Sequence, residues 1–201
     1  MNKKLICQII RIIIVVSTLA AVISVCGRQT DSSELGPFVY FTTDSNIFMA
    51  FIALISIFVD MNKNKAFKMI KLMATCAVTL TFLTVVFFLA PRMGYIDSFK
   101  GAYFPMHLST PLLAAVMYIF FEENQKLRTL DFLFGLVPTI IYGAIYTVEV
   151  VVIGQENGGW NDFYMFLAGG ASVSGAILAM LAATSVISFL LVKGNSLRKT
   201  N

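Results

Sequence analysis

Six apolar runs constrain this chain more than any other feature, because each is long enough to cross a lipid bilayer. They contain between 19 and 28 residues, and about 20 residues at 1.5 Å each span the hydrocarbon core. With 58% hydrophobic and 13% charged residues, the chain lacks the polar surface of a soluble domain. We therefore predict an all-α polytopic membrane protein in which residues 1–201 form a single domain of six transmembrane helices. The expected spans are 5–26, 38–59, 69–90, 103–121, 130–153 and 165–192.

Basic residues predict the orientation of these helices, because short cytoplasmic loops retain an excess of Lys and Arg. If the N-terminus is cytoplasmic, ten basic residues fall on the inner side and three on the outer side. We therefore expect both termini in the cytoplasm of a multi-pass protein of the cell membrane. The net charge of +4 then reflects topology, and no nucleic-acid partner is expected. The inner residues are Lys3, Lys4, Lys63, Lys65, Lys68, Lys126, Arg128, Lys193, Arg198 and Lys199, and the outer ones are Arg28, Arg92 and Lys100.

The N-terminal run has one competing interpretation, a cleaved lipoprotein signal that ends at Cys26. The residue before it is Val25, where cleavage requires a small side chain, so we expect the run to remain as the first helix. The three cysteines form no disulfide or metal spacing. The sequence predicts neither a metal site nor a cofactor.

Charged residues inside the spans are informative, because each costs several kcal/mol unless it is paired or faces a cavity. Lys71 and Asp131 lie within a turn of the expected inner edge, so their side chains are expected to reach the headgroups. Arg11 lies six residues inside the first span, and we interpret it as a headgroup anchor. Asp44 and Glu149 remain, and both lie near the expected outer ends of their helices.

Polar residues of three helices share one depth, roughly 6–9 Å below the expected outer boundary. The only histidine, His107, lies in this layer with two threonines and two acids, Thr42, Thr43, Asp44 and Glu149. We predict a shared cavity that opens toward the outer leaflet and takes a lipid or lipid-like small molecule. Residues that lie on the same helix faces complete the expected pocket: Ser45, Asn46, Tyr103 and Tyr146.

Two motifs resemble the six-helix androgen-induced membrane hydrolase family and its uncharacterised prokaryotic relatives. They are Tyr40-Phe-Thr-Thr-Asp-Ser-Asn46 and Met106-His107-Leu-Ser-Thr-Pro111. The resemblance implies a threonine nucleophile in the second helix and a histidine in the fourth, which together hydrolyse fatty acid esters of hydroxy fatty acids. Counting back from Asn46 favours Thr43 as the nucleophile, whereas the Tyr-Phe-Thr pattern favours Thr42. Pro111 follows the histidine more closely than in the animal proteins.

Two functions are compatible with the polar layer. In a hydrolase of lipid esters, neutral His107 would take the threonine proton, Asp44 or Glu149 would orient the imidazole, and Asn46 would donate to the oxyanion. The alternative is a transporter or ligand-binding membrane protein that uses Asp44, His107 and Glu149. The hydrolase predicts covalent labelling of a threonine, and the alternative does not.

Overall fold

The protein folds into a bundle of helices, and the computed structural model describes residues 3–27, 36–60, 62–122, 127–167 and 172–197. None of these residues lies in a β-strand, so the all-α prediction is confirmed. Three long rods are single helices, namely α1 (Lys3–Gly27), α2 (Phe41–Phe58) and α8 (Val173–Ser196). The third rod in chain order consists of α3 (Lys65–Thr84), η2 (Val85–Leu89) and α4 (Ala90–Met93), and the fourth of η3 (Pro105–Ser109), α6 (Thr110–Val116) and η4 (Met117–Phe121). The fifth rod consists of η5 (Thr129–Leu136), α7 (Val137–Thr147) and η6 (Val148–Ile153). The short helices are η1 (Gly36–Val39), α5 (Tyr95–Ser98) and η7 (Gln155–Asn157).

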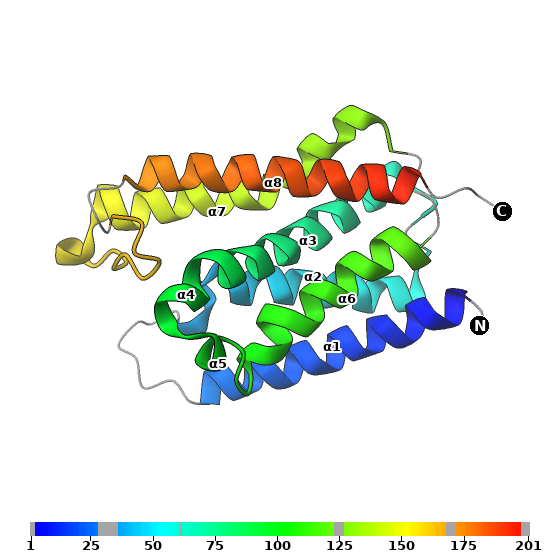
Figure 1. Cartoon of the computed structure of the whole chain (residues 1–201), viewed down its shortest axis with the longest axis horizontal. Coiled ribbons are helices and arrows are strands. Elements are labelled where there is room, and N and C mark those ends of the chain that lie inside the picture. Colours follow the sequence, from blue (N-terminus) through cyan, green and yellow to red (C-terminus); the bar gives the residue numbers. More distant parts are fainter. Residues whose placement is uncertain (1–2, 28–35, 61, 123–126, 168–171, 198–201) are drawn as a thin grey trace.

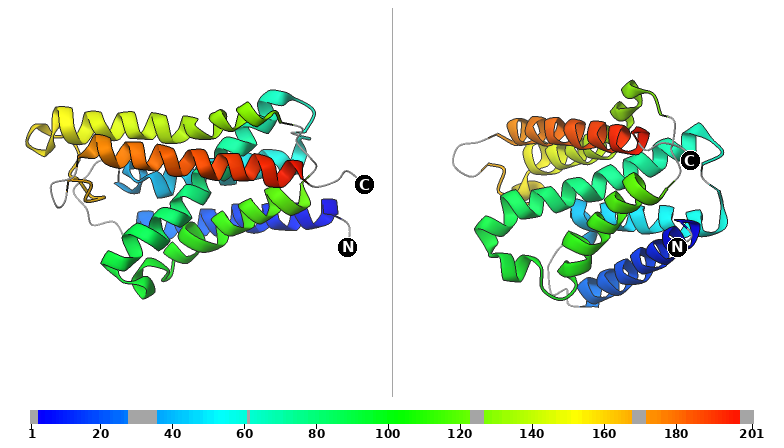
Figure 2. Two further views of the ribbon diagram at one scale, coloured as in Figure 1. Left: turned by 45° about the horizontal axis from the view of Figure 1, so that its top comes forward. Right: turned by 45° about the vertical axis from the view of Figure 1, so that its right-hand side comes forward.

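The helix α3 lies in the middle of the bundle, where it contacts α2, α6, α7 and α8. Figures 1 and 2 show α7 and α8 side by side, with α1, α2 and α6 on the other side of α3. The beginning of α1 and the end of α8 lie at the same end of the bundle (Figure 1), which we call the terminal end. The opposite end, where α1 finishes and α2 begins, is called the distal end.

Apolar side chains cover much of the outer surface of the rods. Among the described residues, five rods are long and apolar enough to cross a membrane, and the rod Pro105–Phe121 is apolar but shorter. Large side chains such as Ile23, Phe87 and Leu178 stay exposed along the rods. Soluble proteins rarely expose apolar patches of this extent, so the surface is that expected of an integral membrane protein.

The last rod begins later than the sequence predicts. The expected span 165–192 becomes α8, Val173–Ser196. Ser172 caps this helix, because its hydroxyl accepts a hydrogen bond from the Gly175 N–H at 3.1 Å. The N–H groups of Phe166 and Leu167 donate instead to the Asp162 carboxylate, so this segment forms a turn. The other five expected spans overlap the observed rods to within four residues at each end.

Two apolar cores form on opposite sides of α3. On one side, Leu72, Cys76 and Leu80 pack against aromatic residues of the neighbouring rods, including Tyr118 and Tyr146. On the other side, Ala74 and Val78 pack against residues of α1, α2 and α6. Because α3 is buried on both sides, it holds the two groups of rods together.

Gly135 of η5 marks a close approach to α8. A Cβ atom at this position would overlap the Ser188 hydroxyl, which is itself held by a 2.6 Å hydrogen bond to the Phe132 carbonyl. Overpacking of a tight interface costs about 1–3 kcal/mol, so we expect Gly135→Ala to lower the free energy of unfolding by this amount. Thermal unfolding in detergent measures the change. Gly27→Ala is the control, since its Cβ would meet nothing within 4 Å, and an equal loss in both variants would contradict the close approach.

Candidate functional site

A cavity of about 420 Å³ lies at the distal end of the bundle. The last turn of α1, the start of α2, the η2–α4 rod, α5, η3 and residues 163–164 form its wall. Four residues of the predicted site lie together around it, namely Thr42, Thr43, Tyr103 and His107. Apolar side chains such as Val85, Leu89 and Met106 line the rest, so the cavity has both polar and apolar walls.

The two threonines lie in the first turn of α2. Thr43 is buried and Thr42 is half-buried. The Phe41 N–H at this helix start donates to the Tyr164 hydroxyl at 3.0 Å, which fixes the turn against the loop that carries Tyr164. Burial raises the pKa of the Tyr164 hydroxyl to about 12, so it stays protonated at neutral pH. Because the two threonines belong to the first turn of α2, they lie at the positive end of the helix dipole, where developing negative charge is stabilised.

The helix widens at His107, because a proline follows four residues later. Pro111 has no N–H and its ring clashes with the carbonyl of the residue four positions earlier, which is His107. The backbone forms a π-helical turn here, η3, in which the Thr110 N–H donates to the Pro105 carbonyl. Such turns occur often at functional sites, since they redirect one side chain of a helix.

A backbone carbonyl fixes the His107 imidazole. Its Nδ1 lies 2.6 Å from the Ser98 carbonyl oxygen at the end of α5. Because a carbonyl can only accept, Nδ1 carries the proton, and Nε2 of the neutral ring keeps its lone pair. The Tyr103 ring stacks on the imidazole with 5.3 Å between the ring centroids, and the Phe99 ring contacts the imidazole edge-on. The ring is thus held in the tautomer that a general base requires.

Asp97 also lines the cavity, and sequence reasoning missed it. It lies beside Ser98 in α5 and is exposed. Both residues belong to the loop 91–102 between two expected spans, so a prediction based on polar residues inside the spans does not include them. Residue types do not predict the contact of the Ser98 carbonyl with His107 either, because every residue has a backbone carbonyl.

Asn46 and Ser45 do not line the cavity but link α2 to neighbouring helices. The Asn46 amide donates to the carbonyls of Thr42 and Met106 at 2.8 and 2.9 Å. Both of its N–H groups are therefore used, and the expected donation to an oxyanion is corrected to a link between α2 and η3. The Ser45 hydroxyl lies 2.9 Å from that of Thr81 on α3.

Asp44, Tyr146 and Glu149 do not line this cavity. Asp44 is exposed on the first turn of α2, where a carboxylate complements the helix dipole. Glu149 is half-buried in η6. The Ser98 carbonyl, and neither acid, holds the imidazole. A carrier that uses both acids with His107 would need them beside it at the cavity.

Tyr146 and Asp162 support the loop that closes one side of the cavity. The Tyr146 hydroxyl donates to the Asp162 carboxylate at 2.6 Å. Partial burial raises the pKa of the Asp162 carboxyl, but the hydrogen bonds from Tyr146, Leu167 and Phe166 outweigh it and hold the pKa below its ordinary value. Met165 in the same turn has a φ of 55°, a strained conformation for a non-glycine residue that its surroundings must maintain.

Asp162→Asn is expected to destabilise this loop at neutral pH, because the amide cannot accept the same charge-assisted hydrogen bonds. A folded-state pKa below the unfolded value stabilises the protein above about pH 4–5, and this contribution disappears as the pH falls through the lowered pKa. The Tm of the variant should therefore lie below that of the parent at pH 7 and approach it in acid. Glu156→Gln is the control, since Glu156 is exposed in the same loop. A pH-independent difference would contradict the role of the charge.

The buried charges at the terminal end are paired inside the protein. Asp131 binds Lys65 at 3.1 Å and also Arg128, so it does not reach toward headgroups. Arg11 binds the Glu122 carboxylate at 3.0 Å, and Lys71 contacts its other oxygen. The expected roles of Arg11 as a headgroup anchor and of Lys71 as a snorkelling residue are thus corrected. Glu122 directly follows the expected span 103–121, so the charged residues counted inside the spans do not include this partner.

Comparisons of the chain with models of protein families, with curated proteins and with solved structures found no match.

Proposed function

We propose that this chain is a multi-pass protein of the cell membrane whose distal cavity hydrolyses lipid esters. Thr42 or Thr43 is the nucleophile and His107 is the general base. One observation carries the proposal: both threonines and the histidine line a single cavity, and the Ser98 carbonyl leaves Nε2 of His107 free to take a proton. This function is also the one that the resemblance to the six-helix hydrolase family implies.

All six rods cross the membrane in this proposal. The rod Pro105–Phe121 has 17 residues, or about 26 Å at 1.5 Å per residue, close to the roughly 30 Å of the hydrocarbon core. An even number of crossings is compatible with α1 beginning and α8 ending at one end (Figure 1). The excess of basic residues in the segments at that end makes it cytoplasmic. The cavity then lies in the outer half of the membrane.

The chemistry needs two steps. His107 Nε2 takes the threonine proton as the threonine oxygen attacks the ester carbonyl, and the proton then goes to the departing alkoxide, which leaves as an alcohol. Water next attacks the acyl-threonine with His107 again as the base, the bond between the acyl carbon and the threonine oxygen breaks, and His107 returns the proton to that oxygen as the fatty acid leaves. The positive end of α2 stabilises the oxyanion of each step. The apolar part of the wall accommodates an acyl chain that enters from the outer leaflet.

A fluorophosphonate probe tests this assignment, because it phosphonylates an activated hydroxyl. The purified parent protein should be labelled. One of the two variants Thr42→Ala and Thr43→Ala, the one that removes the nucleophile, should abolish the label, and so should His107→Ala. Ser109→Ala is the matched control, since this hydroxyl lies on η3 but does not line the cavity. No label in the parent, or equal labelling of all variants, would reject the hydrolase.

Cysteine accessibility tests the orientation. Lys100 and Lys63 are both exposed, near the distal and the terminal end respectively. In a background without Cys7, Cys26 and Cys76, a membrane-impermeant maleimide should label Lys100→Cys on intact cells, and Lys63→Cys only after permeabilisation. The reverse pattern would invert the topology and place the cavity in the inner half of the membrane.

A further inference from the structure

The short helix α5 supplies the carbonyl that holds His107, although this helix belongs to none of the six rods. It follows the rod that ends with α4 and precedes the rod that begins with η3 (Figure 1). A single helical turn has little stability of its own, because it fixes several dihedral angles for one hydrogen bond. The direction of the Ser98 carbonyl therefore depends on the contacts that hold α5 in place.

Gly94 turns the chain from α4 into α5. Its φ is 94°, a conformation that residues with a Cβ atom rarely adopt. The Gly94 carbonyl accepts hydrogen bonds from the N–H and from the hydroxyl of Ser98, at 3.1 and 2.8 Å. These two hydrogen bonds fix Ser98 relative to the start of α5. A further contact is needed to fix α5 relative to the rods.

The Tyr95 side chain joins α5 to the preceding rod. Its hydroxyl donates to the Val86 carbonyl of η2 at 3.1 Å. This carbonyl is open to a side chain because η2 is a π-helical turn that runs into a proline. The Ala90 N–H donates to the Val85 carbonyl, and Pro91, five residues after Val86, has no N–H. The Tyr95 hydroxyl thus takes the place of the missing backbone donor.

We propose that Tyr95 is a positioning residue for His107. Its hydrogen bond holds α5 against η2, so that the Ser98 carbonyl stays 2.6 Å from Nδ1 and keeps the proton on that nitrogen. This role rests on the proposed function, in which Nε2 of His107 is the base. If Nδ1 had no proton, its lone pair would face the lone pairs of the carbonyl oxygen, so this contact excludes the other neutral tautomer.

The effect of Tyr95 reaches His107 only through α5. Tyr95 does not line the cavity, and its side chain is about half exposed. Without its hydrogen bond, α5 can move away from His107, and the neutral imidazole then carries its proton on either nitrogen. Only the tautomer with the proton on Nδ1 can take a proton at Nε2. Tyr95→Phe removes the hydroxyl and keeps the ring, so the bundle itself should stay folded.

Nitrogen NMR of the imidazole tests this role without reference to hydrolysis. His107 is the only histidine, so protein grown with ¹⁵N-labelled histidine gives one pair of ring signals, whose shifts distinguish a protonated from an unprotonated nitrogen. At a pH where the ring is neutral, the parent should have its proton on Nδ1, and Tyr95→Phe should show both tautomers. Ile96→Ala, at an exposed position of the same helix, is the matched control and should keep the parent signals. Parent signals in Tyr95→Phe would overturn the proposal.

Ester hydrolysis gives a second readout. Tyr95→Phe should lower kcat by about 2-fold to 10-fold, the range expected for the loss of one hydrogen bond, and should leave KM nearly unchanged. Gly94→Ala should lower kcat as well, because its φ strains any side chain although the Cβ would meet nothing closer than 3.8 Å. A larger change in KM than in kcat would overturn the positioning role. If the parent hydrolyses no ester, the proposed function fails, whereas the tautomer signals still decide the role of Tyr95.

Discussion

Replacement of His107 by alanine should lower ester hydrolysis at least about 100-fold, the loss typical of a missing general base. The imidazole is the only group of its kind in the chain, and its Nδ1 is already committed to the Ser98 carbonyl. In the proposed reaction, loss of the ring removes the acceptor for the threonine proton, so the effect should fall on kcat more than on KM. Hydrolysis of a long-chain ester in detergent micelles measures it.

His107→Gln separates catalysis from structure in the same experiment. Its amide can donate to the Ser98 carbonyl as Nδ1–H does, but it cannot act as a base. We therefore expect a Tm nearer to that of the parent and hydrolysis as low as in His107→Ala. If His107→Gln retained hydrolysis, the histidine would be a structural link between α5 and η3 and not a base.

Glu122→Gln is expected to be among the most damaging single substitutions for stability. The carboxylate lies between two buried cations of different helices, and its loss removes the one carboxylate that pairs with them among the described residues. Removal of one partner from a buried ion pair costs about 3–5 kcal/mol. Thermal or denaturant unfolding in detergent should therefore show a much lower midpoint.

Lys71→Met provides the contrast for this prediction. It removes one of the two cations and leaves Arg11 paired with Glu122, so it should cost much less than Glu122→Gln. Glu156→Gln makes the same chemical change as Glu122→Gln at an exposed position and should leave the midpoint unchanged. If Glu122→Gln behaved like Glu156→Gln, the cluster would not stabilise the bundle.

The rods and part of the cavity are predictable from the sequence, because both follow from local patterns. Runs of apolar residues give the helices, and helix rise gives the depth of each polar residue. This arithmetic places Thr42, Thr43 and His107 in one layer, and the structure arranges them around one cavity. Depth alone does not say which way a side chain faces, so the prediction also includes Asp44 and Glu149, which do not line the cavity.

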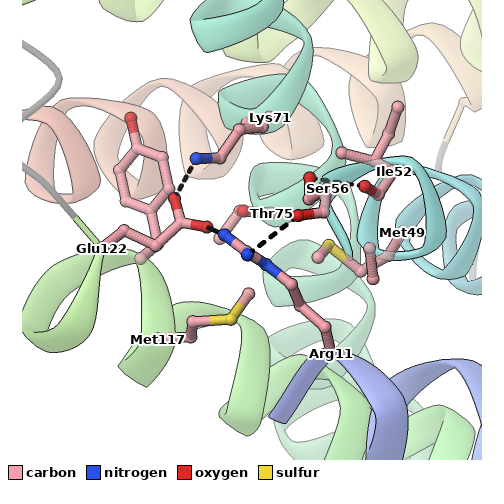
Figure 3. A pocket seen from close by; sticks show the side chains of 10 residues that line it. Arg11, Met49, Ile52, Ser56, Lys71, Thr75, Met117 and Glu122 are labelled. Carbon is pink, nitrogen blue, oxygen red and sulfur yellow. Dashed lines mark hydrogen bonds and ion pairs between the residues drawn. The ribbon is translucent and has the colours of Figure 1, made fainter. Parts of the chain in front are cut away.

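The missed features depend on contacts between distant segments. The Ser98 carbonyl holds His107 from a short helix outside the rods. Glu122 lies just past the end of its rod, and only packing brings it between Arg11 and Lys71 (Figure 3). The start of α8 depends on Asp162, which takes the backbone N–H groups of the preceding turn. Residue types alone do not record these pairings.

Mass spectrometry of the acyl-enzyme tests the central claim most directly. The purified protein is mixed with a long-chain fatty acid ester, quenched in acid and digested. The account predicts an acyl group on the peptide that contains Thr42 and Thr43, and its absence from His107→Ala. Ester turnover without acylation of this peptide, or equal acylation with and without His107, would contradict the account.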